Sequence, residues 1–331
     1  MKAISLFSGG LDSMLAIKLI TQQNIEVIAL HINIGFSSTK NSIELLEQRA
    51  IMAGAKFEVL DVRSDYIKDI LFSPKYGYGK NFNPCIDCHG YMFRIAKEMM
   101  NHYDASFLVT GEVVGQRPMS QNRDALNIVD KLSNNIEDKL IVRPLCAKHL
   151  EATTPELMGW IDREKLLDIS GRSRERQLAL AKEFGWNDYE SPSGGCLLTN
   201  IDYSAKIREF IAYDNDFDVN DIALLKLGRH FRLDNGAKLI VGRDEIDNAR
   251  IDEIESEKYI KFKLPIIGSV SMISANATFE DKLLASKIAI TYAKHEKDKI
   301  YSVLIGDEVF EVSAYESKFD THRYFFEKKN K

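Results

Sequence analysis

The chain has 331 residues, of which 45% are hydrophobic and 28% are charged, and its formal net charge is −5. This composition is typical of a soluble globular protein, and the length predicts two domains or slightly more. We expect neither a membrane-spanning nor a secreted protein, because no apolar run is long enough to cross a bilayer and Met1-Lys2-Ala3 leads straight into a predicted strand. We therefore expect a cytoplasmic protein with no membrane partner. Because the net charge is negative, any nucleic acid must bind a local basic surface.

The first predicted strand, residues 3–7, is followed at once by Ser-Gly-Gly-Leu-Asp-Ser at residues 8–13 and then by a mainly apolar predicted helix. Glycines let the backbone bend so that its N–H groups point inward, and the helix N-terminus adds a partial positive charge. This order of elements predicts an anion site in which Ser8 and Ser13 add hydroxyl donors. Asp12 cannot bind an anion directly, so it either caps the helix or holds a metal ion that accompanies phosphates. A strand–turn–helix joint whose serines and aspartate only cap is the alternative interpretation.

The same hexapeptide resembles the PP-loop of the ATP pyrophosphatases. It is not a Walker loop, since no Gly-Lys-Ser/Thr follows, and it lacks the three-glycine spacing of a dinucleotide fingerprint. In that superfamily the loop grips the β- and γ-phosphates of ATP while a substrate oxygen attacks the α-phosphate, which forms an adenylate and pyrophosphate. The resemblance therefore implies a site for ATP and Mg²⁺ made of Ser8, Gly9, Gly10, Asp12 and Ser13.

Two further predicted strands, residues 26–34 and 57–62, flank a predicted helix over residues 42–52. Strands that alternate with helices over short connections indicate an α/β fold with a doubly wound parallel sheet. The resemblance implies that this sheet is of the PP-loop type, which is also called adenine nucleotide alpha hydrolase-like. Ligands of such sheets lie at the carboxyl ends of the strands. By the same resemblance the end of the second strand, with His31, contacts adenine, and a plain loop is the alternative.

A Cys-x-x-Cys pair, Cys85 and Cys88, follows Asn-Pro at the start of a predicted amphipathic helix. This spacing places two sulfurs close enough to share one ligand, and we expect the helix N-terminus to lower their pKa toward the thiolate form. The next predicted strand ends in Thr110-Gly111, a further candidate lining of the nucleotide site. Arg117 lies in the polar loop 115–123. We interpret this loop either as one that faces the substrate or a phosphate or as a solvated surface loop.

An arginine-rich stretch carries Arg172, Arg174 and Arg176, and the first and last of these are spaced to share one face of a predicted helix after Gly171. The predicted apolar side of this helix consists of Leu178, Ala181 and Phe184. Interleaved acidic residues make a salt-bridged helix the default interpretation. Binding of an RNA backbone by the three arginines is the alternative hypothesis.

Cys196 ends the turn Ser-Pro-Ser-Gly-Gly-Cys at residues 191–196. A cysteine on a Gly-Gly turn is open to close approach by other groups, and packing explains it poorly. With Cys85 and Cys88 it gives three thiols. A zinc site would need a fourth ligand, for which His89 is the nearest candidate. A thiol pair could instead carry a persulfide and form a disulfide as sulfur is handed over, or the three cysteines could hold an iron–sulfur cluster with one open iron.

The PP-loop combined with these three cysteines resembles the tRNA thiolation enzymes, the tRNA 2-thiouridylases and 4-thiouridine synthases, over about the first two hundred residues. The resemblance implies that ATP adenylates a uracil carbonyl oxygen and that sulfur then replaces the adenylate. It implies catalytic roles for Asp12, Cys85, Cys88 and Cys196, with the three cysteines as metal ligands. Because the sequence shows no sulfur-carrier domain, we favour a [4Fe–4S] cluster that uses free sulfide over a persulfide relay from a cysteine-desulfurase-derived donor. Zn²⁺ or no metal is the alternative.

The later segment 225–232, continuing through residues 240–248, resembles the NFACT RNA-binding domain. Its tail at residues 322–329 mixes aromatic and basic residues, which suits RNA stacking and phosphate contact, although a docked terminus explains the aromatics equally well. The predicted elements of this α+β module are strands 237–241, 259–263, 301–305 and 309–313 and a helix over 280–294. We therefore predict a PP-loop thiolation domain over residues 1–200 and an RNA-binding domain over residues 201–331, with tRNA as the partner.

Two other functions stay open at this point. One is a PP-loop ligase or amidotransferase that adenylates a small molecule, and the other is a non-catalytic, ATP-regulated RNA-binding protein. Thiolation makes a geometric demand that separates it from both, because Cys85, Cys88 and Cys196 must cluster and face residues 8–13 across one cleft.

Overall fold

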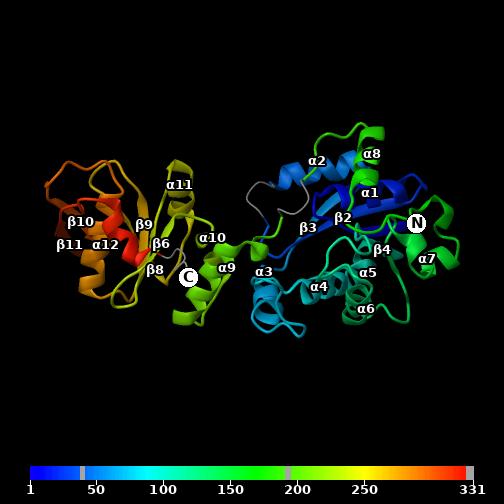
Figure 1. Ribbon diagram of the computed structural model, residues 1–331, viewed down its shortest axis with the longest axis horizontal. Helices are drawn as coiled ribbons and strands as arrows, with labels where there is room; N and C mark the ends of the chain where they lie inside the picture. The colour runs from blue at the N-terminus through cyan, green and yellow to red at the C-terminus, as the bar shows by residue number, and fades with distance from the viewer. Residues whose placement is uncertain (38–41, 191–194, 326–331) are drawn as a thin grey trace. The chain divides into compact units, whose positions relative to one another are not determined.

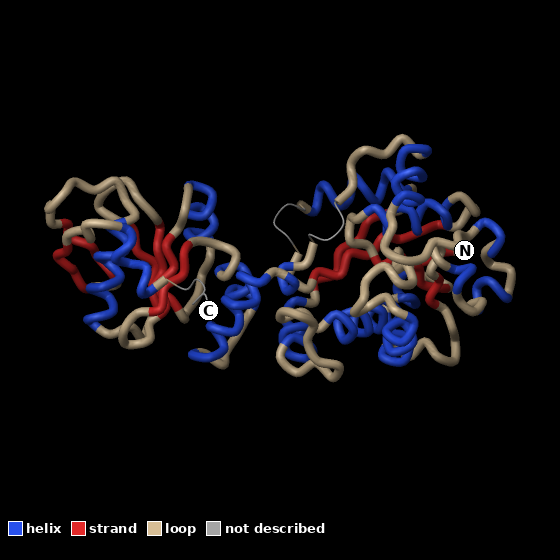
Figure 2. Tube along the Cα trace, viewed as in Figure 1, coloured by secondary structure: helices blue, strands red, loops and turns tan. Residues whose placement is uncertain are grey.

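The computed structural model describes residues 1–37, 42–190 and 195–325. The chain divides into two compact units, Met1–Asn200 and Ile201–Lys331 (Figure 1). Each unit has its own sheet and its own helices, as the red and blue segments of Figure 2 show. No helix within the described residues is both long and apolar enough to cross a membrane.

The first unit is built on a five-stranded parallel sheet with the strand order β3-β2-β1-β4-β5. Its strands are β1 (Lys2–Leu6), β2 (Glu26–Asn33), β3 (Lys56–Asp61), β4 (Phe107–Val109) and β5 (Ile141–Val142). The chain first extends the sheet to one side of β1 and later adds β4 on the other side, so the order reverses at β1. Open parallel sheets bind ligands at this reversal, and residues 8–13 follow the carboxyl end of β1. The predicted α/β fold with a doubly wound parallel sheet is confirmed.

Helices cover both faces of this sheet, with α1, α2 and α8 on one face and α4, α5 and α6 on the other (Figure 1). Buried residues of α1, among them Met14, Leu15 and Ile17, lie in the central core, which explains why its sequence is apolar almost all round. The bounds of the helices are α1 (Leu11–Thr21), α2 (Ile43–Ala53), α3 (Arg63–Tyr66), α4 (Cys85–Glu98), α5 (Met100–Tyr103), α6 (Arg123–Leu132), α7 (Thr154–Leu157) and α8 (Glu175–Glu183), with a π-helix at Ile67–Leu71.

The helix predicted after Gly171 forms, but it begins only at Glu175. Arg172 therefore precedes α8, and the prediction that it shares a helix face with Arg176 is wrong. Leu178, predicted on the apolar side, is 49% exposed, whereas Gln177 is fully buried. The reason is polar: the Gln177 side chain donates a hydrogen bond of 3.1 Å to the side chain of Gln116, which turns this position of α8 inward.

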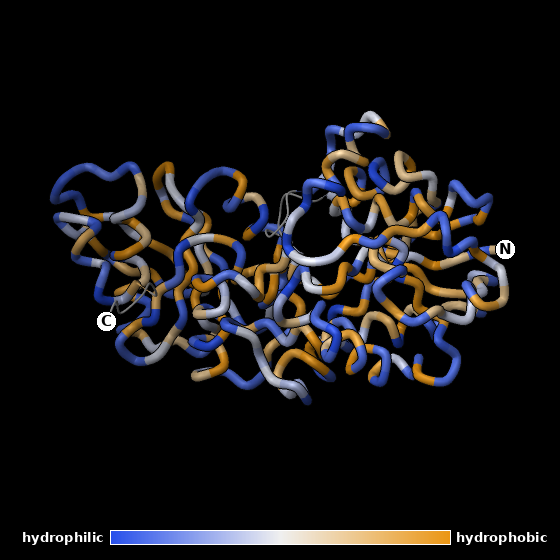
Figure 3. The backbone as a smooth tube through the Cα atoms, turned by 45° about the vertical axis from the view of Figure 1, so that its right-hand side comes forward, coloured by the Kyte–Doolittle hydropathy of each residue, from blue (hydrophilic) through white to orange (hydrophobic). Residues whose placement is uncertain are grey.

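The second unit contains a four-stranded antiparallel sheet in the order β6-β7-β9-β8 and a β10-β11 hairpin. Hydrophobic residues, orange in Figure 3, gather inside each unit, and here β7, β9, α12 and the hairpin share one core. The predicted strands occur as β7, β8, β10 and β11 and the predicted helix as a shorter α12, while β6 and β9 were not predicted. The elements are α9 (Ile201–Tyr213), α10 (Val219–Leu224), β6 (Arg229–Arg232), β7 (Lys238–Val241), α11 (Glu245–Glu253), β8 (Tyr259–Lys263), β9 (Val270–Ser274), α12 (Phe279–Thr291), β10 (Tyr301–Ile305) and β11 (Glu308–Val312).

Candidate active site

A cavity of about 290 Å³ opens in the first unit where β1, β2 and β4 end. Its wall brings together the PP-loop, one of the three predicted sulfur residues and two of the four predicted RNA-binding arginines. The predicted residues that line it are Ser8, Gly10, Asp12, Ser13, His31, Thr110, Gly111, Arg117, Arg174 and Cys196. Segments far apart in the sequence thus contribute to a single site.

The PP-loop turns at Gly9, whose φ of +77° lies in the left-handed region that favours glycine. A Cβ atom there would also lie 2.3 Å from a methyl group of Leu46. The hydroxyl of Ser13 donates to the carbonyl oxygen of Gly10 at 2.7 Å, and the N–H of Gly10 donates to the hydroxyl of Ser8 at 3.4 Å. Both predicted hydroxyls therefore stabilise the loop from within, and they face the cavity.

Asp12 does not cap α1, whose N-cap residue is Gly10 and which has no side-chain capping bond in the described part of the chain. One oxygen of its carboxylate, Oδ2, accepts hydrogen bonds from Gln116 at 2.7 Å and from Arg174 at 3.0 Å. The other oxygen, Oδ1, is buried and has no hydrogen-bond partner among the described residues. The interpretation of Asp12 as a helix cap is wrong, and a carboxylate oxygen is left for a ligand in the cavity.

Gly111 lets the end of β4 pack directly against the PP-loop. A Cβ atom at this position would lie 2.5 Å from the carbonyl carbon of Asp12 and from the amide nitrogen of Ser13. Both are backbone atoms, which cannot move aside as a flexible side chain can. Thr110, just before it, accepts the N–H of Glu112 on its hydroxyl at 3.3 Å. Only glycine fits position 111 without displacing the loop that would hold phosphate.

His31 is a buried histidine at the far wall of the cavity, on β2. Its Nδ1 lies 3.0 Å from the carbonyl oxygen of Phe7, so Nδ1 carries the hydrogen and donates it. Burial lowers the pKa of this imidazole, although the bond to Phe7 opposes the shift. The ring is therefore neutral near pH 7, and its Nε2 is a hydrogen-bond acceptor. An acceptor suits the exocyclic amine of adenine.

The three predicted sulfur residues share one environment. Cys85 begins α4, Cys88 lies one turn further, and Cys196 lies beside Ser37 in an isolated antiparallel bridge. The fully buried Tyr66 interacts electrostatically with all three thiols, and the Cys88 thiol with the other two. The segment that carries Cys196 is fixed by the N–H of Leu197, which donates to the carbonyl oxygen of Phe36 at 2.8 Å. Residues 191–194 of the predicted turn lie outside the described residues.

The pKa of Cys88 moves opposite to the prediction. Burial raises the pKa of Cys88 well above its ordinary value and that of Cys196 to about 11, and neighbouring thiols add to both shifts. The predicted lowering by the helix N-terminus is therefore wrong for Cys88, because loss of hydration outweighs it. Within the described residues no group of three His, Cys, Asp or Glu side chains has the arrangement of a metal site.

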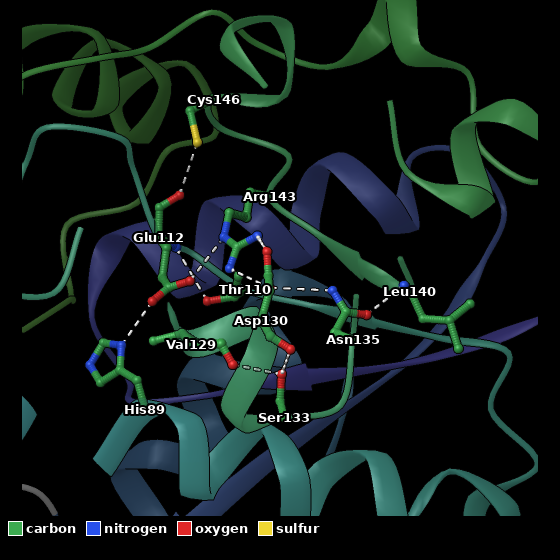
Figure 4. Close-up of polar contacts among 10 residues, drawn as sticks. All are labelled: His89, Thr110, Glu112, Val129, Asp130, Ser133, Asn135, Leu140, Arg143 and Cys146. Carbon is green, nitrogen blue, oxygen red and sulfur yellow. Dashed lines mark hydrogen bonds and ion pairs between the residues drawn. The ribbon is translucent and has the colours of Figure 1, made fainter. Parts of the chain in front are cut away.

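A buried ionic network that the sequence did not reveal borders the same cavity (Figure 4). The Glu112 carboxylate, 4% exposed, accepts from Nδ1 of His89 at 2.8 Å and from Nε of Arg143 at 3.0 Å. Arg143 continues to Asp130 at 3.1 Å, and Cys146 donates to the Glu112 carbonyl oxygen at 3.4 Å. Burial opposes ionisation of Glu112, but Arg143 and His89 outweigh it and hold its pKa below the usual range. His89, proposed as a zinc ligand, is therefore already engaged through one ring nitrogen.

The predicted RNA-binding arginines separate into two groups. Arg172 and Arg176 are exposed, Arg117 is exposed at the cavity wall, and Arg174 is largely buried beside Asp12. In the C-terminal tail, Tyr324 is buried and the ring of Phe325 packs edge-on against Phe231 at 5.0 Å. A docked terminus thus accounts for these two aromatics, and residues 326–329 lie outside the described part of the chain.

Comparison with known families supports the class of protein that the fold and the cavity indicate, which is a PP-loop protein. Residues 2–76 match the argininosuccinate synthase N-terminal HUP domain, and residues 228–319 match the NFACT protein RNA binding domain. The predicted resemblance to PP-loop proteins with an NFACT-type domain is confirmed.

The individual proteins to which the chain is similar carry names that are more specific than these two family descriptions. The chain is 27% identical over 183 residues to a probable tRNA sulfurtransferase of Thermococcus kodakarensis, a match that covers 55% of this chain and 43% of that protein. It is 31% identical over 178 residues to the tRNA-specific 2-thiouridylase MnmA of Helicobacter hepaticus, covering 49% and 52%. A crystal structure of a 4-thiouridine synthetase–RNA complex with bound ATP is 20% identical, with a TM-score of 0.38 over 56% of this chain and 40% of that one. The chain spans about half the length of the curated relatives it matches.

Proposed function

We propose that this protein is an ATP-dependent tRNA uridine sulfurtransferase. Residues 1–200 form the domain that activates and thiolates the base, and residues 201–331 form the domain that holds RNA. One observation carries the proposal: a single cavity is lined by both the PP-loop and Cys196. Activation modifies the carbonyl oxygen and sulfur delivery acts on the carbon bonded to it, so the two steps require one shared site.

The activating half consists of the PP-loop and the strand ends beside it. Ser8, Gly9, Gly10 and Ser13 bind the β- and γ-phosphates, with the N-terminus of α1 directed at them. His31, Thr110 and Gly111 border the nucleoside. The buried Oδ1 of Asp12, which has no hydrogen-bond partner among the residues that the structure describes, fits a Mg²⁺ ion that accompanies the phosphates. The uracil carbonyl oxygen attacks the α-phosphate of ATP, and pyrophosphate leaves. The oxygen is then part of AMP, which is a good leaving group, whereas the free carbonyl oxygen is a poor one.

The sulfur half consists of Cys85, Cys88 and Cys196. Loss of hydration raises the pKa of Cys88 and of Cys196, so these two thiols are poor nucleophiles in the free protein, which argues against a persulfide relay. We propose that these cysteines hold a [4Fe–4S] cluster, with Zn²⁺ as the alternative. When bound, such a cluster supplies an open iron position for sulfide from solution or from a desulfurase-derived donor.

The RNA is held by a local basic surface, as the net charge of −5 requires. In the first unit the exposed Arg172, Arg176 and Arg117 are the candidates. The NFACT-type domain at residues 228–319 supplies the second contact. We propose tRNA as the substrate because two relatives that match about half of this chain are named as tRNA-modifying enzymes.

The test is the thionucleoside content of total tRNA after deletion of the gene. We expect one thionucleoside to disappear and to return with the wild-type chain but not with Cys196→Ala. A matched control is Cys146→Ala, since Cys146 is a buried thiol held by a backbone carbonyl of the core. An unchanged nucleoside profile would refute the proposal. Anaerobic purification followed by iron, zinc and sulfide analysis then separates a cluster from zinc and from a metal-free site.

A small-molecule ligase is the second candidate, and one match favours it. The chain is 36% identical over 67 residues to the argininosuccinate synthase of Saccharomyces cerevisiae, covering 20% of this chain and 15% of that protein. Pyrophosphate release separates the two functions. Release that depends on tRNA supports thiolation, whereas release that depends on a metabolite and is indifferent to RNA supports the ligase.

A further inference from the structure

Arg174 lies inside the cavity, paired with the aspartate of the PP-loop. Its terminal nitrogen is 3.0 Å from Oδ2 of Asp12, and the two side chains are only 16% and 17% exposed. Arg174 immediately precedes α8, whereas Asp12 lies in the first turn of α1. The pair therefore joins two segments that are distant in the sequence, and it does so at the wall where Ser8 and Ser13 lie.

The backbone around Arg174 is fixed by the loop that follows β4. Gly171 turns with a φ of +79°, and its N–H donates to the carbonyl oxygen of Val114 at 2.9 Å. Gln116, from the same loop, donates to Asp12 at 2.7 Å and accepts from Gln177 of α8 at 3.1 Å. These bonds hold the guanidinium at the cavity rather than at the surface.

Hydrogen-bonding capacity remains unused in this pair. Nε of Arg174 and Oδ1 of Asp12 are both buried, and neither has a partner among the described residues. A guanidinium presents five N–H donors in a planar fork that matches phosphate oxygens. An unpaired buried donor is unfavourable, so a ligand that accepts from Nε would relieve it.

We infer that Arg174 binds the phosphate chain of the nucleotide and that Asp12 holds its guanidinium at the PP-loop until the nucleotide arrives. The inference rests on the proposed function in one respect, since it requires a nucleoside triphosphate in this cavity. It separates Arg174 from Arg172 and Arg176, which remain the candidates for contact with RNA. Arg174 adds a cation to a phosphate site whose loop otherwise offers only neutral donors.

The experiment is calorimetric titration of the full chain with α,β-methylene-ATP and, separately, with adenosine, in the presence of Mg²⁺. We expect Arg174→Gln to weaken binding of the triphosphate analogue by roughly ten- to a hundredfold and binding of adenosine by less than about twofold. Arg174→Lys keeps the charge but not the fork, so an intermediate loss is expected. The control is Arg94→Gln, which removes a surface pair with Glu98 in the same unit and should leave both affinities unchanged.

Equal losses for both ligands would overturn the inference, because they would show that Arg174 only maintains the shape of the loop. Unchanged affinity in Arg174→Gln would overturn it as well. A wild-type chain that binds neither ligand would remove the inference and the proposed function together. If the expected discrimination is found but no thionucleoside depends on the protein, the proposed function fails while the assignment of Arg174 stands.

Discussion

Replacement of Arg143 by methionine removes the cation that the buried Glu112 carboxylate shares with the partly exposed Asp130 carboxylate. Glu112 is 4% exposed and lies 3.0 Å from Arg143, and Asp130 is 20% exposed and lies 3.1 Å from it. Breaking a buried ion pair by removal of one partner costs about 3–5 kcal/mol, because the remaining charge has lost both its partner and its water. We expect Arg143→Met to lower the free energy of unfolding of the first unit by this amount. Most of the loss arises at Glu112, since Asp130 can recover hydration.

The assay is urea unfolding followed by tryptophan fluorescence. Both tryptophans of the chain, Trp160 and Trp186, lie in the first unit, so the signal reports on that unit alone. The expected shift of the midpoint is about 1–2 M urea toward lower concentration. Lys56→Met is the control, because Lys56 pairs with Glu26 on the surface and its loss should leave the midpoint close to that of the wild type.

The pH dependence of this difference gives an independent check. In the wild type the folded pKa of Glu112 is lowered, so its stabilising contribution is present above the unfolded pKa of about 4.3 and is lost as the pH falls through the folded value. In Arg143→Met, burial without the cation raises that pKa, so folding loses stability as the pH rises above the unfolded value. The difference in stability between the two proteins should therefore be smaller near pH 4 than near pH 7. A midpoint within about 0.5 M of the wild type, or a gap that is equal at both pH values, would refute the reasoning.

Three further predictions concern the cavity itself. Gly111→Ala places a Cβ atom 2.5 Å from the backbone of Asp12 and Ser13. We therefore expect the free energy of unfolding in urea to fall by about 1–3 kcal/mol and the binding of ATP to weaken. If neither changes, the loop can move aside and the reasoning is wrong. Because burial lowers the folded pKa of His31, its contribution to stability is complete above the unfolded pKa of about 6.5 and is lost as the pH falls below it. His31→Gln should flatten that part of a thermal-stability curve, and a curve parallel to the wild type would contradict this. With a pKa of about 11, Cys196 in metal-free protein should react with iodoacetamide at pH 8 at least about a hundredfold more slowly than free cysteine, and mass spectrometry showing equal rates would contradict its burial.

Local patterns in the sequence predicted the first unit well. A strand, a glycine turn and an apolar helix are contiguous, so the PP-loop and its place at the carboxyl end of β1 follow from short-range chemistry. The prediction of the second unit was less complete. β9 carries Ser271 and Ser274 in a short strand and was missed, because its burial depends on pairing with both neighbouring strands of the sheet.

The sequence by itself determined which residue types are present for the chemistry: a phosphate loop with its aspartate, and the three thiols of Cys85, Cys88 and Cys196. Only the tertiary structure decided how they are used. It turned Arg174 away from its two neighbouring arginines and onto Asp12, and it assembled Glu112, Arg143 and His89 from three separate segments. It also reversed the predicted pKa shift of Cys88. The physical reason is common to all three, since ion pairing and desolvation depend on distances and burial across the fold and leave no periodic pattern along the chain.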